Sequence, residues 1–232
     1  CNGEVDVMIL KVNIEMKTME QTMHSKNEPV LTYRISYPEF RSAVFFKNTQ
    51  KLSAYYRRRA AVFESYCRTA LYRMAVETAE EMRKSGYPVL KFEAVEEFNV
   101  TYNENCALSL YFDRYLFTGG AHGTTERTSD TWELNQNGKR VGMDSLFPEN
   151  FDYEGFVMGE VVAQIREQME NGGMYFENYE QNVADTFQKE NFYLTEYGLT
   201  VYFQQYDIAP YAAGIPQFLL PYRKNGPMPP RC

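Results

Sequence analysis

Residues 48–84 read NTQKLSAYYRRRAAVFESYCRTALYRMAVETAEEMRK, and their apolar side chains recur every three or four positions. This period places the apolar side chains on one face of a helix. The expected face consists of Leu52, Tyr56, Ala60, Phe63, Cys67, Ala70 and Met74. Asn48 is suited to cap the first turn, and Gly86 and Pro88 follow the last one. The stretch therefore predicts one long helix from about residue 49 to residue 84.

The segments on both sides of this helix alternate between apolar and polar residues, which is the period of a half-buried strand. The strands predicted in this way are residues 8–16, 31–37, 90–102, 106–117 and 124–134. A polar stretch at 18–28 is expected to connect the first two, and His24 within it is interpreted as a solvated side chain. Asn103–Glu104–Asn105 has the composition of a hairpin turn.

The last third of the chain repeats this mixture of helices and strands. A helix is expected at 153–170, with Asp152 as its N-cap and Gly172–Gly173 at its exit. A further helix is expected at 178–189. The strands predicted after it are residues 192–195, 199–203 and 217–221. Tyr206 to Ile215 reads as an ordered loop, because Pro210 and Gly214 interrupt it.

Strand pairs joined by short turns, with helices inserted as blocks, predict an α+β fold with mainly antiparallel sheets. The N-terminal half is expected to hold one long helix and the C-terminal half one or two helices. Two domains are predicted, residues 1–118 and residues 119–232, packed against each other as one unit. The second of these includes two unusual segments, GGAHG at 119–123 and YDIAPYAAG at 206–214.

Composition limits the classes of partner. The formal net charge is −7, and the only local basic run, Arg57–Arg58–Arg59, is followed by apolar helical residues, so it is interpreted as a solvated helix face. We therefore expect no nucleic acid as a partner, whereas an acidic chain suits cationic partners. Tyrosine is abundant, with 19 residues, and combines an apolar face with a polar tip that favours recognition surfaces.

The four cysteines indicate neither a metal site nor a reactive thiol. They show no CxxC spacing and no clustering with histidine, so no metal is predicted. Cys67 lies on the apolar helix face and is interpreted as a small buried side chain. Cys1 allows two interpretations, the lipid-carrying residue of a secreted lipoprotein or a mere boundary of the chain. No segment reaches the ~20 apolar residues of a membrane span, so contact with a membrane is expected only through such an anchor.

Known catalytic motifs are absent from the sequence. It contains no GxSxG, no Walker loop, no HExxH and no dinucleotide-binding glycine pattern, and we predict no cofactor and no catalytic residue. His122 is the one candidate for a general base, but no spacing around it forms a recognised triad. Its glycine neighbours favour a tight turn between two strands, in which the imidazole hydrogen-bonds to the nearby backbone and locks the loop.

Two stretches together resemble a family of bacterial envelope domains. They are YLFTGGAHGTTERTSDTWELNQNGKRVGMDSLF at 115–147 and FYLTEYGLTVYFQQYDIAPYAAGI at 192–215. Their combination is similar to the extracellular, lysozyme-sensing domain of the anti-sigma factor RsiV and to the N-terminal, non-catalytic region of the peptidoglycan deacetylase PdaC. The layout of residues 5–112, two strands, a long helix and a hairpin, is similar to the domain that precedes these stretches in both.

This resemblance implies a non-catalytic, extracytoplasmic binding or sensing module of the cell envelope. Its expected partner is lysozyme or another cationic protein, or alternatively a cell-wall glycan stacked on tyrosine. The expected contact residues are His122, Tyr206, Asp207, Pro210 and Tyr211. Two alternatives stay open: a peptidoglycan-directed hydrolase or deacetylase that uses His122 as its base, and a purely structural envelope domain.

Overall fold

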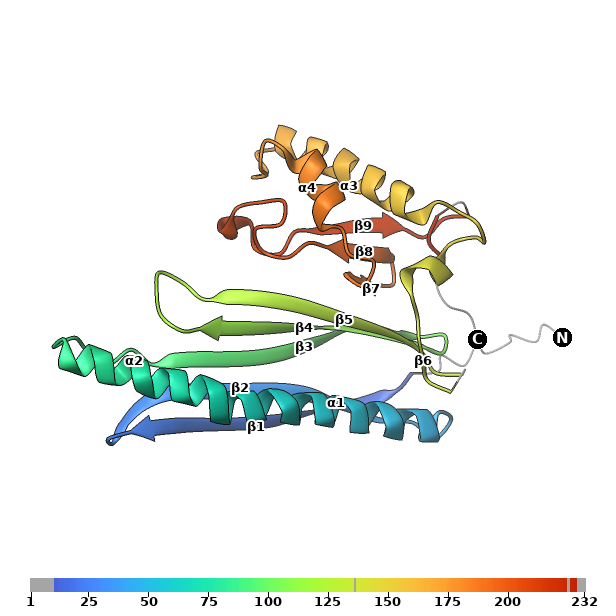
Figure 1. Ribbon diagram of the computed structural model, residues 1–232. Coiled ribbons are helices and arrows are strands. Elements are labelled where there is room, and N and C mark those ends of the chain that lie inside the picture. Colours follow the sequence, from blue (N-terminus) through green and yellow to red (C-terminus); the bar gives the residue numbers. More distant parts are fainter. Residues whose placement is uncertain (1–10, 136, 225, 229–232) are drawn as a thin grey trace.

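The computed structural model describes residues 11–135, 137–224 and 226–228, which form an α+β protein with two sheets (Figure 1). The larger sheet contains β1 (Asn13–Ser25), β2 (Glu28–Arg41), β3 (Phe92–Glu104), β4 (Ala107–Phe117), β5 (Thr124–Glu133) and β6 (Lys139–Arg140), in that order. The smaller sheet contains β7 (Phe192–Leu194), β8 (Gly198–Tyr202) and β9 (Gln217–Pro221). The predicted fold class is confirmed.

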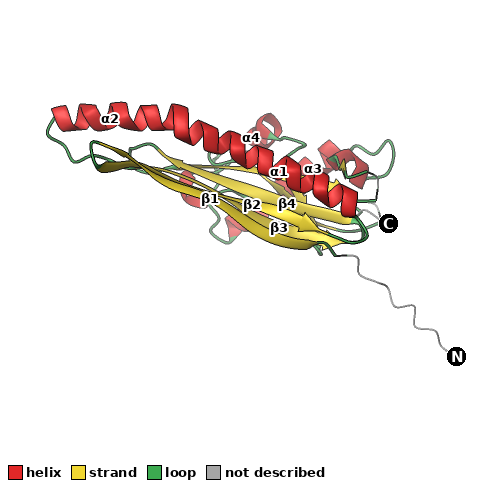
Figure 2. Ribbon diagram, turned by 90° about the horizontal axis from the view of Figure 1, so that it is seen from below, coloured by secondary structure: helices red, strands yellow, loops and turns green. Residues whose placement is uncertain are grey.

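One long helical segment crosses between β2 and β3. It consists of α1 (Phe46–Tyr66), a π-helical turn η1 (Cys67–Leu71) and α2 (Tyr72–Lys84), and it lies along one face of the larger sheet (Figure 2). Because of this crossover β2 and β3 pair in parallel, while all other neighbouring strands in the described part of the chain are antiparallel. The helix begins at Phe46 rather than at the predicted position, so Asn48 lies inside its first turn instead of capping it. The Asn48 Nδ2 donates to the Leu134 carbonyl at 2.6 Å.

The π-helical turn corrects the predicted buried face of this helix. Up to Cys67 the buried positions are those expected, but beyond it the buried residues are Leu71, Ala75 and Ala79. Met74, expected inside, is 44% exposed. A π-helical turn holds one residue more than an α-helical turn, so each inward position after it moves by one residue. The helical period alone could not reveal this insertion.

One further expectation about the N-terminal strands needs correction. The predicted first strand at 8–16 begins outside the described residues, and β1 continues through the stretch that we expected to be a polar connection. His24 therefore lies in a strand, where β1 pairs with β2 along its length. The connection is a short turn in which Lys26 and Asn27 have φ angles of 54° and 69°. Pairing with β2 satisfies the backbone of β1, so weak hydrophobic alternation did not prevent a strand.

A buried ion cluster lies between the long helix and the sheet. Glu96 of β3 is 1% exposed, and its Oε2 accepts hydrogen bonds from Arg114 Nε at 2.9 Å and from Arg59 at 3.3 Å. The Arg59 guanidinium lies 3.7 Å from the centroid of the Phe112 ring, and Arg114 lies 3.9 Å from that of Phe63. The carboxylate is thus paired twice, and both cations are stacked on aromatic rings.

The smaller sheet is covered on its outer side by α3 (Tyr153–Glu170) and α4 (Tyr179–Thr186), and its inner side faces β4 and β5 (Figure 1). Asp152 caps α3 as predicted, because its Oδ1 accepts from Gly155 N at 3.1 Å. The apolar core of this half includes Val157, Val161 and Ile165 of α3. No helix in the described ranges combines the length and apolar character that a membrane span requires. The predicted division at residue 118 stays a prediction.

Candidate binding surface

The β4–β5 loop turns sharply because of its glycines. Gly119 and Gly120 have φ angles of 106° and 93°, a region that other residues rarely adopt. Gly123 is needed for a different reason, since a Cβ at this position would lie 2.4 Å from Tyr115 Cε2 and 2.6 Å from the Leu116 carbonyl oxygen. The chain can therefore fold back onto β4 only without a side chain at Gly123. His122 is held at the tip of this compact loop.

The loop between β8 and β9 is ordered by its own polar contacts. Tyr206 has a φ angle of 69°, and the following Asp207 accepts a hydrogen bond from Gln204 N through its Oδ2 at 2.8 Å. Burial raises the pKa of the Asp207 carboxyl, while this hydrogen bond opposes the shift. Pro210 precedes a single 3-10 turn, Tyr211–Ala213, and Gly214 with a φ angle of 69° ends it.

The two loops meet, although 84 residues separate His122 from Tyr206. The His122 imidazole stacks on the Tyr211 ring with a centroid distance of 3.7 Å and an interplanar angle of 16°. Its Nδ1 lies 3.0 Å from the Gly123 carbonyl oxygen, which can only accept, so we assign the proton to Nδ1. Its Nε2 then accepts from the Tyr206 hydroxyl at 3.4 Å. We call His122, Tyr206 and Tyr211 the aromatic cluster.

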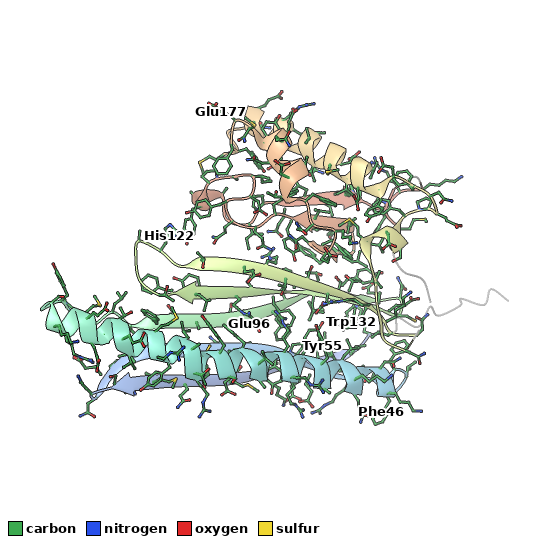
Figure 3. The ribbon with its side chains drawn as sticks, in the orientation of Figure 1. Phe46, Tyr55, Glu96, His122, Trp132 and Glu177 are labelled. Atoms are coloured by element: carbon green, nitrogen blue, oxygen red, sulfur yellow. The ribbon has the colours of Figure 1, made fainter. Side chains whose placement is uncertain are left out.

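The aromatic cluster is accessible to a partner. Tyr206 is 51% exposed, His122 is exposed and Tyr211 is half-buried. Figure 3 places His122 at the tip of the β4–β5 loop, below the loop that follows β8. Of the five predicted contact residues, the structure brings these three together. Asp207 and Pro210 instead shape the loop that carries them, and Cys1 lies outside the described residues.

Two residues that the sequence analysis missed join the loops. Gln204 Oε1 accepts from Arg127 N at 2.9 Å, and Gln204 Nε2 donates to the Arg127 carbonyl at 2.7 Å. Gln205 Oε1 accepts from Thr125 N at 2.8 Å. A side-chain amide has the same donor and acceptor as a peptide group, so a glutamine pair at the end of a strand was the available signal.

The environment of His122 gives it no catalytic partner among the described residues. No carboxylate in this part of the chain contacts the imidazole, and its Nδ1 is held by its own loop. A general base needs an orienting group and a nucleophile to serve. Likewise, the described residues contain no group of three His, Cys, Asp or Glu side chains that could hold a metal ion.

Two other features lie away from the aromatic cluster. A cavity of about 800 Å³ lies between the β5 edge and the segments around Arg140 and Lys189, and no predicted contact residue lines it. Cys67 is free and fully buried, and burial raises the pKa of its thiol to about 12. Cys106 is disulfide-bonded. Cys67 therefore agrees with its interpretation as a buried apolar side chain.

Comparisons with known proteins agree with this two-sheet α+β architecture. A family model described as Deacetylase PdaC matches residues 24–125, and one described as Protein of unknown function (DUF3298) matches residues 144–223. The chain thus carries a PdaC N-terminal domain followed by a DUF3298 domain, the pair found in RsiV-like proteins. Both matched regions are non-catalytic, and no catalytic domain was matched. No curated protein matches the sequence.

Two solved structures of DUF3298 proteins have a similar fold. A crystal structure of a family member from Bacteroides fragilis NCTC 9343 has a TM-score of 0.69 and 20% sequence identity, and the match covers 92% of each chain. One from Pseudomonas aeruginosa PAO1 has a TM-score of 0.57 and 16% identity, with 94% of this chain and 97% of that chain covered. At these identities the likeness concerns the fold alone.

Proposed function

We propose that the chain is a non-catalytic binding module of the bacterial cell envelope that acts outside the cytoplasm. PdaC N-terminal and DUF3298 domains are known from envelope proteins, which supports this compartment. The observation that carries the proposal is the aromatic cluster. His122 comes from the region matched by the first family model, and Tyr206 and Tyr211 come from the region matched by the second.

The partner that we propose is a cationic protein, with lysozyme as the specific candidate. The net charge of −7 favours association with a basic partner through long-range attraction. Tyrosine and histidine rings that are already stacked lose little side-chain entropy on binding, and tyrosine is among the residues that dominate binding energy in interfaces. The aromatic cluster therefore supplies short-range contacts, while the net charge raises the rate of encounter.

Isothermal titration calorimetry of the purified chain with lysozyme tests this proposal. We expect binding, and we expect the double substitution Tyr206→Ala and Tyr211→Ala to weaken it by roughly tenfold or more. Tyr197→Ala is the matched control, because Tyr197 is 67% exposed but lies in the turn between β7 and β8. The absence of heat, and of inhibition of lysozyme activity, at ~100 μM protein would exclude lysozyme as the partner.

A cell-wall glycan is a second candidate, favoured by the exposed aromatic rings. Sugar rings pack against such flat apolar faces, and the Tyr206 hydroxyl could exchange hydrogen bonds with ring substituents. The same calorimetric titration with soluble peptidoglycan fragments separates the two partners.

Light scattering of the chain alone tests the structural-domain alternative, which expects a stable oligomer. Lipid on Cys1 remains a prediction, to be checked by mass spectrometry of the native protein.

A further inference from the structure

Gln204 and Gln205 occupy the place of a missing neighbour strand. The short β6 pairs with β5 only at Trp132 and Glu133, so the β5 edge near its start has no strand partner among the described residues. There Gln204 exchanges two hydrogen bonds with the Arg127 backbone, the pattern of a hydrogen-bonded antiparallel pair. Gln205 adds one at Thr125.

These contacts join the two chain segments that carry the aromatic cluster. Thr125 follows His122 by three residues, so β5 positions the loop that carries the imidazole. Gln204 and Gln205 immediately precede Tyr206, whose backbone is in the left-handed region with a φ angle of 69°. Such a conformation costs about 1–3 kcal/mol and persists only when its surroundings enforce it. The Gln204 side chain, the Gln205 side chain and Asp207 together provide that enforcement.

We infer that Gln204 and Gln205 are positioning residues that hold the binding surface in its assembled form, and we call their three hydrogen bonds the amide clasp. Neither residue is in the aromatic cluster. The clasp keeps His122 against Tyr211 before any partner arrives, so the partner meets a preorganised surface and less of its binding energy is lost to ordering the loops. The consequence for binding rests on the proposed function, whereas the assembly of the cluster does not.

The two glutamines differ in a way that provides matched variants. Gln204 uses both its donor and its acceptor, whereas Gln205 uses only its acceptor with the described residues. Gln204→Glu removes the donor and places a carboxylate oxygen beside the Arg127 carbonyl, so this variant should open the clasp. Gln205→Glu, an equally small change with the same charge, keeps an acceptor for Thr125 N and should leave the clasp closed.

Proton NMR of the His122 ring tests the inference without a ligand. In the wild type and in Gln205→Glu, stacking on Tyr211 should shift the imidazole protons upfield, and Gln204→Glu should lose this shift. The indole N–H of Trp132, the single tryptophan, donates to Tyr56 of α1 near the opposite end of β5 from the clasp. Its resonance should stay unchanged in both variants, which distinguishes an opened clasp from an unfolded protein.

Calorimetry with lysozyme then tests the consequence for binding. We expect Gln204→Glu to bind about tenfold more weakly and Gln205→Glu to bind like the wild type. If Gln204→Glu does not fold, Gln204→Met, which keeps the length and loses the amide, replaces it. An unchanged His122 signal in the Gln204 variant that folds overturns the inference. If the wild type fails to bind lysozyme while the His122 signals behave as expected, lysozyme is rejected as the partner. The inference that the amide clasp positions the aromatic cluster is then retained.

Discussion

The larger sheet has two very different contacts with the rest of the molecule. The face under the long helix is closed by a continuous apolar stripe, by aromatic rings and by the buried Glu96. The β5 edge is joined to the smaller sheet by side-chain amides and by the Ser129 hydroxyl, which donates to the Phe192 carbonyl and accepts from the Tyr202 hydroxyl. The first contact excludes water, and the second leaves aromatic rings exposed beside it.

These two contacts locate stability and recognition in different parts of the molecule. Burial of apolar area dominates folding free energy, so the helix-covered face should determine global stability. A single hydrogen bond contributes a net stability of only about 1 kcal/mol, but it forms only in a narrow range of geometries. The β5 edge should therefore determine the geometry of the loops more than the stability of the fold. Two substitutions and one change of pH distinguish the contribution to stability from the contribution to loop geometry.

The largest effect is expected for Glu96→Gln under the helix. The change removes the negative charge that both Arg59 and Arg114 share, and it leaves two cations packed against apolar rings. Removing one partner of a buried ion pair costs about 3–5 kcal/mol, and the lower value applies because both arginines retain some access to water. Urea unfolding measures the loss. Glu93→Gln, at an exposed position on the same strand, should change stability by less than about 0.5 kcal/mol.

An intermediate effect, confined to the other region, is expected for Gly123→Ala. The added Cβ would collide with Tyr115 and with the Leu116 carbonyl, so the β4–β5 loop must shift at a cost of about 1–3 kcal/mol. His122 should then lose its stack on Tyr211, visible by NMR. Gly159→Ala is the control, because Gly159 lies in α3 with nothing within 4 Å of its Cβ position. It should stabilise the protein by about 0.5–1 kcal/mol. Retention of the stack in Gly123→Ala would contradict the expected coupling.

The smallest expected effect is a pH dependence of stability that arises from Cys67 on the helix-covered face. Cys67 has a pKa of about 12 in the folded protein against 9.0 for an ordinary thiol, because burial disfavours the thiolate. The unfolded chain therefore loses this proton first, and stability should decline from about pH 9 upward by at most about 1.4 kcal/mol per pH unit. Cys67→Ala should remove this decline in urea titrations between pH 9 and 10. Above that range Tyr33 and Tyr202, with pKa values raised to about 12, add a decline of the same sign. Identical slopes for wild type and Cys67→Ala would contradict a buried, neutral thiol.

Much of the fold followed from periodicity and turn composition. The long helix, the β3–β4 hairpin and the Asp152 cap each depend on residues that are close in sequence, and the structure has all three. Periodicity did not predict the parallel pairing of β2 with β3 or the length of β1, because tertiary contacts determine which strands pair. Asn48, which we expected to cap the helix, instead donates a hydrogen bond to a carbonyl 86 residues away in sequence.

The candidate site, too, could be predicted from the sequence only in part. The glycines around His122 indicated a tight turn, and the structure places the imidazole hydrogen bond to Gly123 within that turn. The contact of His122 with Tyr206 and Tyr211 requires the packing of the two sheets, which no local pattern encodes. Gln204 and Gln205 were not predicted because glutamine in a loop is usually solvated. Their amides find partners on the part of the β5 edge that has no neighbouring strand among the described residues.

The π-helical turn at Cys67–Leu71 has a consequence for how the chain tolerates insertions and deletions. In α1, loss of one residue would rotate everything beyond it by about 100° and turn Ala75 and Ala79 away from the sheet. Within the π-helical turn, loss of the exposed Arg68 or Thr69 would convert the turn to an ordinary α-helical one and preserve both flanking faces. The helix thus contains one short segment in which its length can change by a residue while its contacts with the sheet are kept.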